Sequence, residues 1–185
     1  MTVEFNRVHL VIAASLVLLC GNLPARATTT QTAQKCGAKP EEPAQRMFAD
    51  TDGLNHWREY KELKAVPEGN PDGSGFARLW AGSNGQEFVL VQWGNQDWAW
   101  YAEYCFDKSG QLTRLRYELR TAWGWGRRLE GPFLGGRLVP ETSEFFSTES
   151  EQPIERPGSD PSELSSYLEP RIYRTKSQLP FSRLL

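Results

Sequence analysis

Tryptophan side chains are the strongest candidates for ligand contact in this sequence, because flat indole rings stack on other flat groups and attract cations. Six of the seven tryptophans lie within residues 80–125. At the end of that region lies the run WGWGRR, in which the two glycines give the neighbouring indoles few local packing partners. The two arginines that follow can bind an anion. The alternative is a strand whose glycines let another part of the chain approach closely. We predict a binding segment formed by Trp123, Trp125, Arg127 and Arg128.

The tryptophans of residues 97–106 follow a different pattern. Trp98 and Trp100 are two residues apart, and the same spacing continues to Tyr104 and Phe106. Side chains two apart in a strand point to the same face of the sheet, so these four aromatic residues share one face. A face this apolar is typical of a protein core. We therefore expect Trp98 and Trp100 to be structural.

Nucleophilic catalysis finds little support in the sequence. The hydroxyl in the most suitable surroundings belongs to Ser74, which has a glycine on each side but lacks the G-x-S-x-G pattern of many hydrolases. A serine or cysteine nucleophile also needs a base, and His56 is the one histidine beyond residue 27. A single histidine beside a turn is typical of a surface or packing residue. We predict no catalytic residue.

The run DTDG at residues 50–53 has acidic residues two apart before a glycine, as calcium-binding loops do. Glu59 also falls at the position of the last calcium ligand, but the first ligand position is Phe48, which cannot coordinate a cation. Histidine and cysteine are too few and too widely spaced for a zinc site. We predict no metal ion and no cofactor.

Carboxylates offer one route to an enzyme, since two of them across a cleft suffice to hydrolyse a glycosidic bond. Asp97, Glu103 and Glu118 lie in the region with the most regular strand pattern. A polar strand face is usually a solvated one, so this pattern does not itself indicate a cleft. A secreted, carboxylate-dependent glycan hydrolase is therefore an alternative to a binding protein.

Residues 1–27 have the pattern of a cleavable secretory signal peptide. A short polar stretch precedes an apolar run over residues 8–20, and Ala25-Arg26-Ala27 matches an A-x-A cleavage site. The apolar run is shorter than the roughly 20 residues that span a bilayer as a helix. We expect export to the periplasm or the extracellular space, with no transmembrane anchor after cleavage. Lipidation of Cys20 stays open, although the preceding Leu19 is larger than the residue such processing prefers.

Cys36 and Cys105 are the two cysteines beyond the signal peptide. In an oxidising compartment such a pair predicts a disulfide, and two buried thiols are the alternative. Residues 28–43 are rich in polar residues and proline, which predicts a flexible leader. The formal net charge of −2 gives no basic footprint for nucleic acid, so we expect no nucleic-acid partner.

Residues 44–185 are predicted to form a single domain of the α+β class. Apolar residues at helical spacing over residues 44–63, interrupted at 50–53, predict two short helices. From residue 76 the pattern changes to hairpins over 76–93 and 97–123, with further strands over 128–139 and at 145–146. The N-terminal helices would pack on an antiparallel meander sheet of four or five strands. A small half-closed β-barrel is the alternative.

The second hairpin also predicts a register. A loop of residues 107–110 would place Phe106 opposite Gln111 and Glu103 opposite Arg114. Two of the three arginines of the polar face, Arg114 and Arg120, would then pair with carboxylates across the strands, with Glu103 and Asp97, at about 0.2 to 1 kcal/mol for each pair. We expect these arginines to be structural, so that an anion site would use Arg127 and Arg128 instead.

Taken together, these features favour an exported, non-enzymatic binding or interaction domain whose ligand is a glycan or another cell-envelope component. The alternatives are the glycan hydrolase and an envelope accessory protein with a purely structural surface. A deep groove that combines tryptophan with paired acids would favour the hydrolase. Exposed tryptophans without such an acidic groove would favour binding.

Overall fold

The computed structural model describes residues 43–69, 73–82, 85–158 and 166–185. The predicted signal peptide, all but the last residue of the leader, Cys20 and Cys36 lie outside the described residues. None of the helical segments within these ranges is long and apolar enough to cross a membrane.

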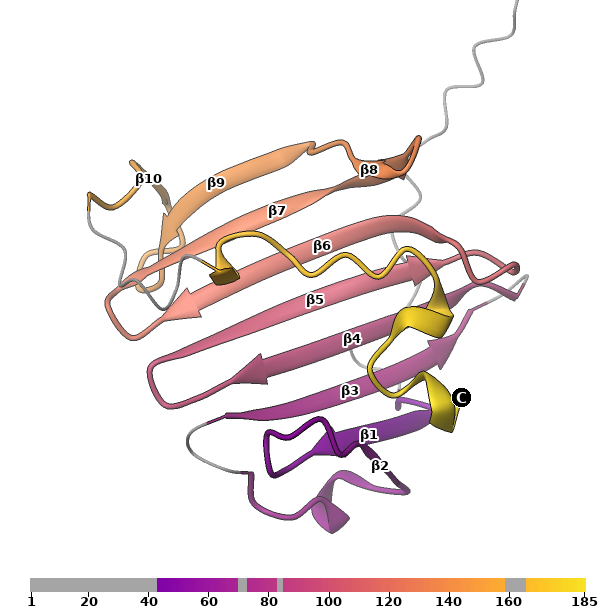
Figure 1. The fold of residues 1–185 in the computed structure, drawn as a ribbon. Coiled ribbons are helices and arrows are strands. Elements are labelled where there is room, and N and C mark those ends of the chain that lie inside the picture. Colours follow the sequence, from indigo (N-terminus) through magenta and orange to yellow (C-terminus); the bar gives the residue numbers. More distant parts are fainter. Residues whose placement is uncertain (1–42, 70–72, 83–84, 159–165) are drawn as a thin grey trace, which may run out of the picture. The chain divides into compact units, whose positions relative to one another are not determined.

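The described residues form a ten-stranded antiparallel sheet in which most neighbours in sequence are neighbours in space. The strand order is β10-β9-β7-β6-β5-β4-β3-β1-β2, and β8 pairs with β7 (Figure 1). The strands are β1 (Arg46–Asp50), β2 (Arg58–Tyr60), β3 (Ser74–Ala81), β4 (Glu87–Gly94), β5 (Trp98–Phe106), β6 (Leu112–Thr121), β7 (Trp125–Leu134), β8 (Arg137–Leu138), β9 (Thr142–Ser147) and β10 (Pro153–Ile154). Three short 3₁₀ turns accompany them, η1 (Leu63–Ala65), η4 (Lys176–Gln178) and η5 (Ser182–Leu184).

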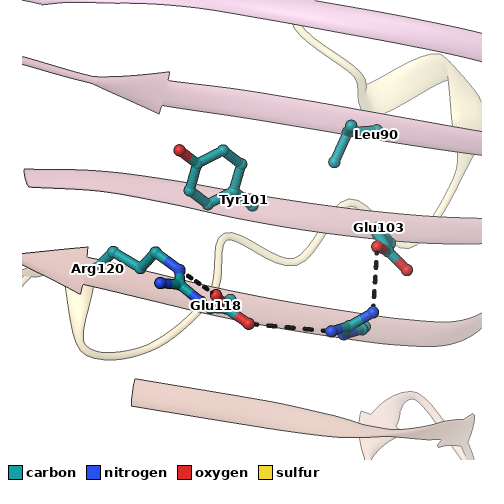
Figure 2. A pocket seen from close by; sticks show the side chains of 6 residues that line it. Leu90, Tyr101, Glu103, Glu118 and Arg120 are labelled. Atoms are coloured by element: carbon teal, nitrogen blue, oxygen red, sulfur yellow. Dashed lines mark hydrogen bonds and ion pairs between the residues drawn. The ribbon is translucent and has the colours of Figure 1, made fainter. Parts of the chain in front are cut away.

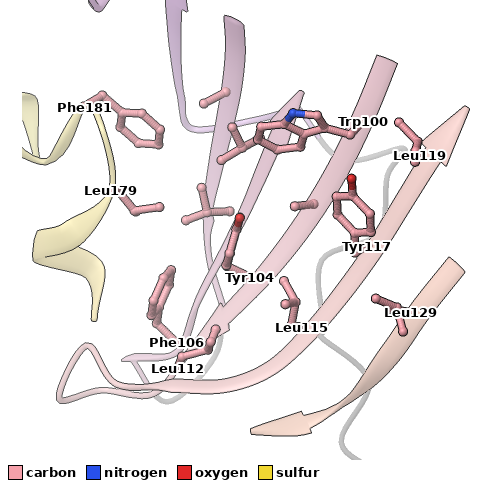
Figure 3. Packing of buried hydrophobic residues seen from close by; sticks show 14 of the residues in the cluster. Trp100, Tyr104, Phe106, Leu112, Leu115, Tyr117, Leu119, Leu129, Leu179 and Phe181 are labelled. Carbon is pink, nitrogen blue, oxygen red and sulfur yellow. The ribbon is translucent and has the colours of Figure 1, made fainter. Parts of the chain in front are cut away.

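One face of this sheet carries the main core, and the alternating pattern of β4 to β7 explains why. Trp98 and Trp100 are 8% and 4% exposed, so their predicted structural role is confirmed. The alternation continues through Tyr104 in β5 and through Leu115 and Tyr117 in β6, which are also buried (Figure 3). Every second side chain of these strands is therefore buried on the same face of the sheet.

Residues 166–185, which we name the covering segment, lie across this apolar face (Figure 1). The Tyr104 hydroxyl donates to the Arg171 carbonyl oxygen at 2.8 Å, and the Tyr117 hydroxyl donates to the Tyr167 carbonyl oxygen. Further along, the Phe181 ring stacks on Phe48 with 4.5 Å between the ring centroids. The covering segment thus contacts β6, β5 and β1 in turn, and it buries the core face that a single sheet would leave exposed.

The predicted helices over residues 44–63 are wrong. This region forms β1, a turn and β2, and β1 pairs with both β2 and β3. The apolar spacing reflects two short strands with a turn between them, in which Gly53 and Asn55 have φ values of 75° and 64°. Leu54 and Leu63, whose spacing suggested a helix, are 69% and 57% exposed.

The prediction of an α+β domain with four or five strands is therefore wrong as well: the described residues hold ten strands and only 3₁₀ turns. The short strands β1, β2, β8 and β10 lack a regular alternating pattern, which is why the sequence did not reveal them. The alternative of a half-closed barrel finds no support, because the described strands follow one open order in which β10 and β2 are not paired.

The predicted register of the β5–β6 hairpin is wrong by two residues. Glu103 lies opposite Arg116 rather than Arg114, and Phe106 lies opposite Leu112 after a bulge at Cys105. The Asp107 side chain holds the loop of this hairpin, because its Oδ1 accepts the backbone N–H groups of residues 109 and 111 at 2.8 and 3.0 Å. A shift of two keeps each side chain on its predicted face.

Candidate ligand-binding cavity

A cavity of about 360 Å³ opens between the core face of the sheet and the covering segment. Its floor comes from β4 and β5, one side from the loop after β1, and the other side from the covering segment. The lining residues are Gly53, Asn55, Trp57, Val91, Trp93, Trp100, Arg171, Tyr173, Gln178 and Pro180. Three of the seven tryptophans of the chain therefore meet at one place.

The tryptophans of the cavity lie against a glycine that makes room for them. The ring centroids of Trp57 and Trp93 are 6.3 Å apart, at an angle of 47° between the planes. Gly75 of β3 lies under both rings, because a Cβ atom built on it would lie 2.5 Å from Trp93 and 2.9 Å from Trp57. Trp57 also packs on Phe181 at 5.1 Å. The sheet and the covering segment together fix these aromatic walls.

Two aspartates hold the loop that carries the Asn55 side of the cavity. The buried Asp50 carboxylate accepts the backbone N–H of Asn55 at 2.7 Å and that of His56 at 3.2 Å. Burial raises the pKa of Asp50, and the nearby Asp52 adds to this effect. The backbone N–H of Leu54 and the His56 ring lower the pKa of Asp52 to about 2. The loop is therefore held by two neighbouring carboxyl groups, and the pKa of Asp50 is higher than that of Asp52.

The polar groups of the cavity are hydrogen-bond donors. Asn55 Oδ1 accepts the Trp57 indole N–H at 2.8 Å, and Gln178 Oε1 accepts the backbone N–H of Arg174 at 2.7 Å. These bonds use the amide oxygens and leave the two N–H donors of each amide nitrogen. Arg171 adds a guanidinium, and none of the described lining residues is Asp or Glu. The cavity therefore offers aromatic faces and donors, and it suits a ligand rich in oxygen acceptors.

The four residues of the predicted binding segment do not share one surface. Trp123 is 49% exposed in the turn between β6 and β7. Trp125 is 6% exposed and packs on Phe145 in the core, with 5.9 Å between the ring centroids. Arg127 pairs with Glu169 of the covering segment at 2.7 Å. Arg128 lies on the opposite face, where its guanidinium pairs with Glu118 at 3.1 Å. Each arginine thus already has a carboxylate.

The predicted disulfide joins residues of which one is described. Cys105 is buried on the face opposite the main core, where it clusters with Trp80 and Phe88. Cys36 lies outside the described residues, so the bridge stays a prediction.

A second hollow, of about 290 Å³, contains two of the carboxylates that suggested a hydrolase (Figure 2). It lies on the polar face of β4, β5 and β6, and Glu103 and Glu118 line it together with Tyr101. Burial raises the pKa of Glu103, while Arg116, at 3.5 Å, acts in the opposite direction. Glu118 is within 3.9 Å of Arg116 and bonds to Arg120 as well. Glu103 and Glu118 are thus both paired with arginines. Tyr101 is the one aromatic residue among the described residues that line the hollow.

The predicted pairing of Arg114 with Glu103 is wrong, although the arginines of this face do have carboxylate partners. Arg114 contacts Glu130 and Glu141, each at 2.7 Å, instead of Glu103. Arg116 takes Glu103 because of the register shift described above. The network is a structural feature of the sheet, and no set of three or more possible metal ligands gathers anywhere in the described ranges.

Sequence reasoning missed the cavity because its walls come from four separated parts of the chain. Trp57 was assigned to a helix, and the covering segment has no periodicity that predicts a position against the sheet. The one available signal was Gly75 in a strand, since a strand glycine often marks a close approach by another group. Comparison of the chain with protein family models, with curated proteins and with solved structures gives no match.

Proposed function

We propose that this chain is a non-enzymatic binding module, acting outside the cytoplasm, that holds a saccharide unit in the tryptophan-lined cavity. The observation that carries the proposal is the meeting of Trp57, Trp93 and Trp100 with side-chain amide donors at one opening. Indole faces suit the apolar C–H faces of a sugar ring, and amide donors suit its oxygens. The signal-like residues 1–27 support a site of action in the periplasm or the extracellular space.

The size of the cavity limits the ligand. Its volume of about 360 Å³ is at the lower end of the range for small-molecule sites, roughly 300 to 1,000 Å³. A single sugar unit, or the end unit of a longer glycan, is therefore a better match than an extended chain. Because the donors lie on both sides, from Asn55 and Gln178, a bound ring would be held between the loop after β1 and the covering segment.

Binding is favoured over hydrolysis by the charges. Glycosidases use two carboxylates that flank the scissile bond, with a separation of about 5 to 9.5 Å. None of the described lining residues of the cavity is acidic. The acids of the second hollow, Glu103 and Glu118, are paired with arginines and have no tryptophan beside them. The tryptophans of the cavity and these two acids therefore occupy different faces of the sheet.

The test is a titration of the purified protein with cellotetraose, chitotetraose and soluble cell-wall fragments, followed by tryptophan fluorescence and calorimetry. Asn55→Ala and Gln178→Ala remove exposed donors from the cavity, so they should weaken binding by about 5- to 10-fold each. Because Asn55 also holds the Trp57 indole and Gln178 holds the Arg174 backbone, urea unfolding of both variants separates the loss of a donor from a loss of structure. Trp57→Ala should abolish binding. Trp123→Ala is the matched control, since this exposed indole lies in the β6–β7 turn and outside the cavity.

The outcomes separate the alternatives. Loss of binding in Trp123→Ala, with Asn55→Ala unaffected, would move the site to the predicted segment at residues 123–128. Release of reducing sugar that stops in Glu103→Gln would establish the hydrolase. No binding to any of the glycans would leave the purely structural protein and overturn the proposal.

A further inference from the structure

Arg171 is the one cationic side chain among the described residues that line the cavity. It lies in the covering segment, it is exposed, and its backbone carbonyl is fixed by the Tyr104 hydroxyl at 2.8 Å. Its backbone is therefore held by the core, while its exposed side chain lines the opening of the cavity.

The arginines of the fold differ in whether they pair with a carboxylate. Six described arginines form ion pairs with Asp or Glu within 4.0 Å, whereas Arg171 takes part in none of the ion pairs found among the described residues. The six are Arg46, Arg114, Arg116, Arg120, Arg127 and Arg128. Exposed arginines such as Arg174 and Arg183 take part in none of these ion pairs either, but Arg171 differs from them because it lines the aromatic cavity, where none of the described lining residues is Asp or Glu.

Tyr173, two residues after Arg171 in the covering segment, lines the same cavity. Burial raises the pKa of the Tyr173 phenol, and the charge and hydrogen bond of Arg171 act in the opposite direction. Tyr173 packs on Tyr104 with 5.3 Å between the ring centroids, so its ring is held firmly. A guanidinium and a neutral phenol hydroxyl therefore lie side by side at the edge of an aromatic cavity.

We propose that the cavity selects a carboxylated sugar, whose ring lies among the tryptophans and whose carboxylate is bound by Arg171, with the Tyr173 hydroxyl as a second donor. This inference rests on the proposed function, because it names the class of saccharide for the same cavity. A guanidinium binds a carboxylate through two parallel N–H···O bonds, so it selects by geometry as well as by charge. Uronic acids and muramic acid carry such a group beside the ring.

The test compares ligands that differ only in charge. Trigalacturonic acid is set against its methyl ester, and N-acetylmuramic acid against its own methyl ester, each by calorimetry at low ionic strength. The wild-type protein should prefer the acid of each pair by about 10- to 100-fold, the range expected for hydrogen bonds to a charged group. The preference should weaken as salt is added.

Arg171→Gln should remove the preference while binding of the neutral forms persists, and Arg171→Lys should keep part of it because a point charge lacks the guanidinium fork. Arg183→Gln is the matched control, since this exposed arginine lies in the covering segment but outside the cavity lining. Tyr173→Phe should reduce binding of the acid more than that of the ester.

Equal affinity for acid and ester, unchanged in Arg171→Gln, would overturn this inference and leave the proposed function standing. A preference lost equally in Arg183→Gln would also overturn it, because the effect would then come from overall charge. Binding of a sulfated trisaccharide without binding of the carboxylated ones would overturn the choice of anion. Failure of acids, esters and neutral tetrasaccharides alike would overturn the proposed function and, with it, this inference.

Discussion

Replacing Phe181 by alanine should detach the covering segment from the first strands of the sheet. Phe181 is 1% exposed, stacks on Phe48 at 4.5 Å between the ring centroids, and meets Trp57 at 5.1 Å. Phe48 belongs to β1 and Trp57 to the loop that forms one side of the cavity. The same side chain therefore joins the covering segment to the sheet and to the proposed site.

The loss of stability can be worked from this packing. Truncation of a buried phenylalanine to alanine costs about 3 to 5 kcal/mol, from lost burial and from the cavity that remains. Because Phe48 is fully buried and held in the sheet, the surroundings cannot collapse easily into the gap. We therefore expect the free energy of unfolding to fall by about 4 kcal/mol, a large part of the roughly 5 to 15 kcal/mol of a typical domain.

The measurement is urea unfolding followed by tryptophan fluorescence, with linear extrapolation to water. Ile172→Ala is the matched control, because Ile172 lies in the same segment but is 37% exposed, so it should change the free energy by less than about 0.5 kcal/mol. Phe181→Leu keeps an apolar side chain, and we expect it to lose roughly half as much. It provides a readout should the alanine variant fail to fold.

A loss below about 1 kcal/mol in Phe181→Ala would refute the reasoning, since it would mean that the covering segment does not depend on this contact. Saccharide affinity should fall together with stability in Phe181→Ala and stay unchanged in Ile172→Ala. An Ile172→Ala variant as unstable as Phe181→Ala would equally contradict the packing described for the segment.

Three further predictions concern other parts of the fold. Gly75→Ala should lower the free energy of unfolding by about 1 to 3 kcal/mol and weaken saccharide binding, because the new methyl group would displace Trp93; unchanged binding would contradict the role of this glycine. The raised pKa of Asp50 means that its contribution to stability is complete below the ordinary Asp value of 3.8 and is lost as the pH rises through the raised value. The free energy of unfolding of the wild type relative to Asp50→Asn should therefore fall with rising pH above 3.8, and a rising difference would reverse the assignment. Non-reducing peptide mapping of the protein purified under oxidising conditions should find Cys36 linked to Cys105, and reduction should cost about 2 to 5 kcal/mol; free thiols at both positions would contradict the bridge.

The faces of the central strands were predictable from the sequence, because alternation in a strand is a local property. Trp98, Trp100 and Tyr104 were assigned to the core from their spacing alone, and all three are buried. The register was not predictable to the residue, since it depends on the loop. The pairing beyond the bulge at Cys105 is shifted by two, which leaves every face unchanged and alters every partner.

Helical spacing over residues 44–63 was misleading for a physical reason. Five apolar residues across 17 positions fit a helix, but two of them, Leu54 and Leu63, are exposed. What decides the structure is the Asp50 side chain, which binds two backbone N–H groups of the following turn and so ends β1. Short polar side chains that form hydrogen bonds with the nearby backbone compete with helix formation. The spacing of apolar residues gives no information about this competition.

The cavity was beyond sequence reasoning because it depends on contacts between distant segments. Trp57, Trp93 and Arg171 come from a loop, a central strand and the covering segment, and no spacing relates them. The sequence pointed instead to residues 123–128, where tryptophans and arginines are adjacent in the chain. Adjacency in a strand places neighbours on opposite faces, which is what separates Arg127 from Arg128.

The covering segment follows the ten described strands in the sequence, so a ribosome makes it after them. Until it emerges, the apolar face of β4 to β6 has no partner, and the newly made sheet presents aromatic surface to other chains. Chains with such exposed surface aggregate or bind chaperones. Expression yield should therefore respond more strongly to changes in residues 166–185 than to changes at exposed loop positions such as Trp123, and co-expressed chaperones should rescue the former.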